Sequence, residues 1–200
     1  MAYLENGLEK AGYQVVNWSY RSVRDSLPEI AWQLETELQQ YTQDDTVHFV
    51  THSMGGLVVR SFFEFADVEG VTPQLCRLVM IAPPNQGAEI ATFASRLNYN
   101  NWLFGENVEY MRTDKISLAD SLAIPSIEFG IIAAARGAES GYNLFIDGAN
   151  DGYISLPRTY LEGARDYMVI SNMHFFVVYQ KETLENVIHF LKHGQFKSSG

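Results

Sequence analysis

The sequence predicts a single α/β domain in which a mainly parallel sheet carries helices on both faces. Short apolar runs alternate along the chain with stretches whose apolar residues recur at helical spacing, which is the pattern of β-α-β units. The 200 residues are 46% hydrophobic and 19% charged, as is ordinary for one globular domain. No stretch resembles an interdomain linker, so we expect residues 1–200 to fold as one domain.

The strands are predicted by five apolar runs that are rich in β-branched and aromatic residues. The expected strands are Tyr13–Tyr20, Thr46–Thr51, Leu75–Ala82, Ser126–Ala133 and Tyr167–Ser171. Because helical patterns separate them, neighbouring strands are expected to run in the same direction.

The helices are predicted from apolar spacing and from residues typical of helix ends. Residues 1–12 have the pattern of a helix that stops at Gly12. Ser26, two residues before Pro28, suits the N-cap of a helix that runs toward Tyr41. The remaining helices are expected to run from just after Ser53 to about Phe65 and over Lys181–Lys192.

Two segments do not follow the alternation. Asn98–Asp120 is aromatic and Asn-rich, and we interpret it as a surface insertion after the third predicted strand that could form a lid or cap. Gly141–Pro157 is rich in turn residues, which predicts a loop that displays polar side chains.

Composition argues against several kinds of partner. Aspartate and glutamate outnumber lysine and arginine by 24 to 14, and no basic run occurs, so we expect no nucleic acid partner. A single cysteine, Cys76, and the lack of metal-ligand spacing predict no disulfide and no structural metal. The chemistry considered below needs no cofactor, so none is expected. No run approaches the roughly 18 apolar residues of a membrane span, so no integral membrane association is expected. Localisation and oligomeric state are left open.

Ser53 lies where an apolar strand turns into a helix, in the stretch VHFVTHSMGG. Such a turn projects a serine hydroxyl beyond the sheet and needs small neighbours, here Gly55 and Gly56. The G-x-S-x-G pattern is met in part, since Thr51 replaces its first glycine. At the helix N-terminus, the Met54 amide could donate to an oxyanion. Alternatively, Ser53 only caps the helix.

A serine nucleophile requires a base, and His174 is the candidate among five histidines. It follows the last predicted strand, in SNMHFF, and so is expected at the same sheet edge as Ser53. The other histidines have simpler roles: His48 as a packed strand residue, His52 as a side chain that lines or supports the site, and His189 and His193 as residues of the last helix.

The acid that would orient this base is expected in the turn-rich loop. Asp151 is preferred because Asn150 and Gly152 favour a tight turn that can aim its carboxylate. Asp147, before Gly148, is the alternative, although it could equally be a turn residue.

Together these segments resemble the α/β-hydrolase superfamily, in its bacterial lipase- and esterase-like branch. The resemblance covers most of the chain, through GYQVVNWSY, VHFVTHSMGGLVVR, LVMIAPPNQGAEIA, NDGYISL and HFF in family order. It implies that Ser53 is the nucleophile, Asp151 the orienting acid, His174 the general base and the Met54 amide one oxyanion donor. The implied activity is carboxylic-ester hydrolysis through an acyl-enzyme.

The chain departs from this family at its front. Family members carry an earlier strand that ends in a His-Gly oxyanion loop, and the sequence begins within the helix that follows it. We therefore expect an N-terminally truncated sheet in which the neighbours of the missing strand have exposed edges. The alternative function is a catalytically impaired or non-catalytic α/β-hydrolase-like binding protein, or a truncated relict.

The expected substrate is a small acyl ester or a lipid. The candidate substrate-binding residues are His52, Trp102, Phe104 and Phe175, with Leu103, Tyr110 and Phe176 as further apolar candidates. The aromatic residues among them could instead belong to the ordinary core.

Overall fold

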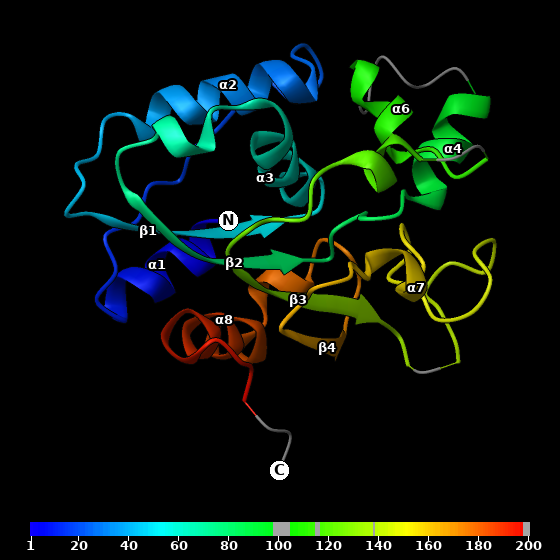
Figure 1. Ribbon diagram of the computed structural model, residues 1–200. Coiled ribbons are helices and arrows are strands. Elements are labelled where there is room, and N and C mark those ends of the chain that lie inside the picture. The colour runs from blue at the N-terminus through cyan, green and yellow to red at the C-terminus, as the bar shows by residue number, and fades with distance from the viewer. Residues whose placement is uncertain (98–104, 115–116, 138, 198–200) are drawn as a thin grey trace.

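The computed structural model describes residues 1–97, 105–114, 117–137 and 139–197 (Figure 1). A four-stranded sheet lies at the centre, in the order β1-β2-β3-β4, and all three strand pairs are parallel. The strands are β1 (Thr46–His52), β2 (Gln74–Ile81), β3 (Glu128–Ala135) and β4 (Asp166–Ser171). The prediction of a parallel sheet is confirmed, and β3 begins two residues later than expected.

Helices cover both faces of this sheet, as predicted (Figure 1). The main ones are α1 (Ala2–Lys10), α2 (Leu27–Leu38), α3 (Met54–Phe65), α4 (Glu89–Arg96) and α8 (Lys181–His193). The short ones are α6 (Val108–Met111), α7 (Leu156–Thr159), η1 (Val68–Gly70), η2 (Gly105–Asn107), η3 (Leu118–Ser121) and η4 (Val177–Tyr179). The predicted N-cap of α2 is present, and its Glu29 carboxylate accepts the Ser26 backbone N–H at 2.7 Å. None of the described helices has the length and apolarity to cross a bilayer.

Two apolar layers result from the alternation of side chains along each strand. In β2, Leu78 and Met80 pack with α2 and α3, whereas Val79 and Ile81 pack with α1 and α8. Because both faces are covered, the strands need apolar residues at consecutive positions, which is why they read as unbroken apolar runs.

The predicted strand Tyr13–Tyr20 is wrong. These residues are not a strand, and no backbone hydrogen bond joins them to β1 within the described chain. A strand exists only where a neighbouring backbone pairs with it, and β1 is the edge of the sheet nearest to this segment. The apolar pattern of residues 13–20 predicts an extended segment but not whether another strand pairs with it, and among the described residues none does.

The predicted insertion, Asn98–Asp120, follows β2, the second strand of the observed sheet. Residues 98–104 and 115–116 lie outside the described residues, and the described remainder contains η2, α6 and the start of η3. Its role as a lid or cap stays a prediction.

Candidate active site

Ser53 occupies the sharp turn between β1 and α3. Its backbone has φ 52° and ψ −127°, a conformation that costs energy for any residue with a Cβ. A backbone hydrogen bond joins the turn to the end of β2, since the Ser53 N–H donates to the Ile81 carbonyl at 2.9 Å. The strain is therefore sustained by the pairing of β1 with β2.

The glycines after Ser53 allow α3 to approach the sheet closely. A Cβ at Gly56 would lie 3.1 Å from the Pro83 Cβ and 3.4 Å from the Met80 sulfur. A Cβ at Gly55 would lie 3.3 Å from the Thr51 Cβ. The contacts at 3.1 and 3.3 Å are tighter than most Cβ contacts in proteins, so a side chain at either glycine would require its neighbours to shift by a few tenths of an ångström.

The side chains of Ser53, His174 and Asp151 form one hydrogen-bonded chain. The Ser53 Oγ lies 2.9 Å from the His174 Nε2, and the His174 Nδ1 lies 2.6 Å from the Asp151 Oδ2. Asp151 and His174 are buried, at 0% and 3% exposure, whereas Ser53 is partly exposed. The chain thus runs from a buried carboxylate to a hydroxyl that solvent can reach.

The hydrogen bonds of Asp151 fix which nitrogen of His174 carries a proton. The Asp151 Oδ1 accepts the backbone N–H groups of Tyr153 and Ile154, at 2.9 and 2.8 Å. The Oδ2 is then free for His174, and a carboxylate can only accept, so the His174 Nδ1 must be protonated. Its Nε2 therefore presents a lone pair toward the Ser53 hydroxyl.

His174 is also held through its backbone. Its N–H donates to the Asp151 carbonyl at 3.0 Å, and its own carbonyl oxygen lies 2.9 Å from the Nε2 of His52. Burial, and secondarily the nearby His174, lowers the pKa of His52 to about 4. At neutral pH His52 is uncharged, and its Nε2–H donates to that carbonyl.

Three rings contact the His174 imidazole, and the ring of His52 lies at a centroid distance of 4.9 Å. Tyr153 stacks on it with a centroid distance of 5.1 Å and an interplanar angle of 21°, and Phe175 meets it edge-on, also at 5.1 Å. Phe175 is 53% exposed, which leaves an apolar surface beside the imidazole that Ser53 contacts. Tyr153 was not predicted from the sequence, although its place two residues after Asp151 was a signal that it would lie near the carboxylate.

The Met54 amide has the free donor that an oxyanion would need. It is the first residue of α3, and its N–H makes no hydrogen bond to another described residue. The helix N-terminus adds partial positive charge at this position.

The predicted site residues are thus largely brought together. Ser53, Met54, His52, His174, Asp151 and Phe175 lie in one cluster, whereas Trp102 and Phe104 lie outside the described residues. The alternative acid, Asp147, is exposed in the loop before it. Among the described residues, no three His, Cys, Asp or Glu side chains are arranged to hold a metal ion.

The architecture is similar to that of several solved bacterial enzymes. Lipase BlEst2 from Bacillus licheniformis, in its mature form, is 17% identical with a TM-score of 0.64, covering 84% of this chain and 75% of its own. The metagenomic carboxyl esterase MGS0156 is 20% identical with a TM-score of 0.65, covering 87% and 58%. Phospholipase PlaB from Legionella pneumophila is 19% identical with a TM-score of 0.58, covering 80% and 41%.

These similarities establish the fold, which is α/β-hydrolase-like. The chain spans less than two thirds of the length of the metagenomic esterase and of the phospholipase. No curated protein sequence matches it. The model of one sequence family matches residues 2–103, just over half of the 200 residues. The chain therefore belongs to the family described as a domain of unknown function (DUF7379).

Proposed function

We propose that this protein is a serine hydrolase that cleaves carboxylic esters through an acyl-enzyme. The observation that carries the proposal is the chain of hydrogen bonds from Ser53 through His174 to Asp151, at 2.9 and 2.6 Å. A strained turn that exposes the hydroxyl, a base in the correct tautomer and a buried carboxylate are the requirements for activating a serine. The fold shared with lipases and esterases supports the same reaction class.

In the first half of the reaction, the Ser53 oxygen attacks the ester carbonyl while His174 takes the hydroxyl proton on Nε2. The imidazolium is stabilised by the Asp151 carboxylate, which remains ionised. The carbonyl oxygen becomes an oxyanion that accepts a hydrogen bond from the Met54 amide. When the tetrahedral intermediate collapses, the C–O bond to the alcohol breaks and His174 returns the proton to the leaving oxygen.

In the second half, water replaces the alcohol. His174 removes a proton from the water as its oxygen attacks the acyl carbon of the Ser53 ester. The second intermediate expels the serine oxygen, which recovers the proton from His174. The products are a carboxylic acid and the free enzyme, so no cofactor is consumed.

The substrate class is inferred from the surroundings of Ser53. The exposed ring of Phe175 and the nearby ring of Tyr153 offer apolar surface for an acyl group. The structural neighbours include a lipase and a phospholipase, which supports a fatty-acyl ester as substrate.

Covalent labelling tests the proposal directly. A fluorophosphonate probe should label the folded protein at Ser53, and Ser53→Ala should abolish the label because no oxygen is left to phosphonylate. His174→Ala should slow labelling by at least about a hundredfold, since the general base contributes 10²–10⁴.

The matched control is His189→Ala, which removes an imidazole of α8 whose ring contacts the Gln195 carbonyl and the ring of His193 rather than the cluster around Ser53. It should be labelled at the wild-type rate. Folded protein that takes up no fluorophosphonate, or that reacts equally after Ser53→Ala, would contradict the proposal and leave the α/β-hydrolase-like fold with a non-catalytic role.

A further inference from the structure

The most exposed large apolar side chains of the described residues are neighbours in the loop that carries Asp151. Leu144 is 91% exposed and Phe145 is 98% exposed, although leucine and phenylalanine are among the residues most often buried in proteins. We name residues 141–153 the acid loop, and these two residues its tip. In Figure 1 the acid loop (yellow) extends past the carboxyl end of β3, the edge of the sheet at which Ser53 also lies.

The acid loop is held in shape by the side chain of Asn150, which is fully buried. Its amide nitrogen lies 3.0–3.1 Å from the carbonyl oxygens of Asn143, Ile146 and Gly148. Its amide oxygen accepts the backbone N–H groups of Asn143 and Gly152, at 2.9 and 3.0 Å. A hydrogen-bonded scaffold therefore displays the tip, and the exposure of the tip is part of the fold rather than the result of an unstructured loop.

More exposed apolar side chains lie in the loop that carries His174. Met173, Phe175 and Phe176 are between 41% and 58% exposed. The two loops are in contact, because the ring of Phe175 meets that of Tyr153 in the acid loop edge-on, with centroids 4.9 Å apart. Exposed apolar side chains thus occur on both loops that bring the base and the acid to Ser53, which is the kind of surface that marks an interaction site.

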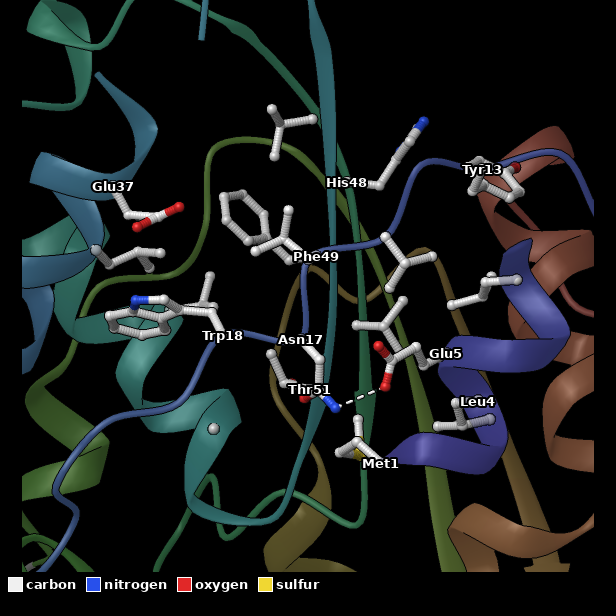
Figure 2. A pocket seen from close by; sticks show the side chains of 18 of the residues that line it. Met1, Leu4, Glu5, Tyr13, Asn17, Trp18, Glu37, His48, Phe49 and Thr51 are labelled. Atoms are coloured by element: carbon white, nitrogen blue, oxygen red, sulfur yellow. Dashed lines mark hydrogen bonds between the residues drawn. The ribbon is translucent and has the colours of Figure 1, made fainter. Parts of the chain in front are cut away.

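The shape of the tip favours a lipid surface over a protein partner. Along β1, apolar side chains such as Leu4, Trp18 and Phe49 surround a cavity of about 440 Å³ (Figure 2). That surface is concave, whereas the tip protrudes. A protein partner would need a pocket that complements the tip, but hydrocarbon chains adapt to a side chain of any shape. The tip exposes on the order of a few hundred Å², which is less than the roughly 800 Å² per partner of a stable protein interface.

The charges near the tip favour a lipid surface without net charge. The acid loop contains two aspartates and no lysine or arginine, and residues 172–176 contain no ionisable side chain other than His174. Anionic membranes attract proteins through lysine and arginine, and they repel carboxylates. The whole chain carries a formal net charge of −10, so binding to a membrane has to come from apolar contacts.

We propose that the tip inserts into the surface of a zwitterionic phospholipid bilayer and thereby brings Ser53 close to esters held in that surface. Insertion would bury Leu144 and Phe145 at the boundary between headgroups and acyl chains, as in proteins that lie on a membrane without crossing it. The binding step depends only on the tip, whereas the delivery of substrate to Ser53 rests on the ester hydrolysis proposed above.

Binding is tested with the full chain carrying Ser53→Ala, which cleaves no ester, and vesicles of phosphatidylcholine alone. In flotation experiments, half of the protein should be bound at about 1 mM lipid. Phe145→Ser should lower the partition coefficient at least about tenfold, because it removes a ring that insertion buries. Phe65→Ser is the matched control, since it makes the same change at a 43% exposed ring at the far end of α3 from Ser53, and it should bind as the parent does.

A tryptophan at the tip shows whether the tip itself enters the bilayer. The emission of Phe145→Trp should shift to the blue when vesicles are added. It should also be quenched by phosphatidylcholine that carries bromine on its acyl chains. Phe65→Trp should show neither change. Both variants are compared with the parent protein, which contains three tryptophans.

Hydrolysis separates this proposal from the proposed function. With Ser53 intact, Phe145→Ser should lower the rate on a fatty-acyl ester in vesicles, relative to the rate on a soluble ester, by at least about tenfold. Vesicle binding through the tip without hydrolysis of either ester would support insertion and contradict only the esterase. Hydrolysis of the soluble ester without vesicle binding would support the esterase and contradict insertion.

Four outcomes would overturn the proposal. These are no binding at about 10 mM phosphatidylcholine, equal binding by Phe145→Ser, an unchanged emission of Phe145→Trp on binding, or tighter binding to phosphatidylglycerol vesicles, which would show that charge drives the association. Self-association without lipid that Phe145→Ser abolishes would identify a second copy as the partner of the tip, and would also overturn it.

Discussion

Asp151→Asn should nearly abolish hydrolysis without unfolding the protein. The Oδ1 of Asp151 accepts two backbone N–H groups, from Tyr153 and Ile154, and an amide nitrogen cannot accept them. The asparagine carbonyl oxygen must therefore take this place, which turns its NH₂ group toward the His174 Nδ1. A donor there forces the His174 proton onto Nε2, so the ring can no longer accept the proton of Ser53.

The magnitude follows from this change of tautomer. Loss of the correct tautomer and of the carboxylate charge in a serine triad lowers kcat by roughly 10⁴. At about 1.36 kcal/mol for each tenfold change, the barrier rises by about 5.4 kcal/mol. KM should change little, because Asp151 is fully buried and does not reach the surface on which an ester would lie.

The assay is the initial rate of p-nitrophenyl butyrate hydrolysis per mole of folded protein. Asp147→Asn is the matched control, since it makes the same change at an exposed residue of the same loop and should keep wild-type kcat. Urea unfolding checks that both variants are folded. If folded Asp151→Asn keeps more than about a tenth of the wild-type kcat, the assignment of this carboxylate as the orienting acid is refuted.

Three further predictions concern stability. In urea titrations, the free energy of unfolding of Ser53→Gly should exceed that of Ser53→Ala by roughly 1 kcal/mol, because only glycine adopts φ 52° without strain. Equal stability of the two variants would contradict this. His52 binds its proton in the unfolded chain near pH 6.5 but in the folded chain only near pH 4, so acidification through this window should remove up to about 3 kcal/mol of unfolding free energy. That loss should be absent from His52→Asn, as urea titrations at several pH values would measure. Arg60→Met should cost about 3 kcal/mol in the same assay, since the buried guanidinium donates to the carbonyls of Asn85 and Leu122, at 3.0 and 2.6 Å; a neutral outcome would show that these carbonyls find other donors.

The central strands were predictable from the sequence because the second half of β2 and almost all of β3 are buried on both faces. A run such as the one containing Leu78 and Val79 must be apolar at every position to meet helices on either side, and this leaves an unmistakable pattern. The same pattern at residues 13–20 led to a wrong prediction. Apolar patterning reports that a segment is extended and covered, but it carries no information on whether a partner strand lies alongside.

The site was predictable where the chemistry constrains the order of residues. Ser53, Asp151 and His174 were found because each follows a strand and must meet the others at the carboxyl edge of one parallel sheet. The stacking of Tyr153 and the bond from His52 to the backbone of His174 were not predicted. Both depend on how one loop lies over another, which no local pattern specifies.

The separation of Ser53 and His174 along the chain has a consequence for refolding. Ser53 and His174 are 121 residues apart, and between them lie the three strands that must pair before the two loops meet. Parallel pairing joins distant segments and is slow to form. The rate at which Ser53 becomes reactive after dilution from denaturant should therefore equal the rate at which the whole sheet is completed. A stopped-flow series with a fluorophosphonate probe would measure that rate.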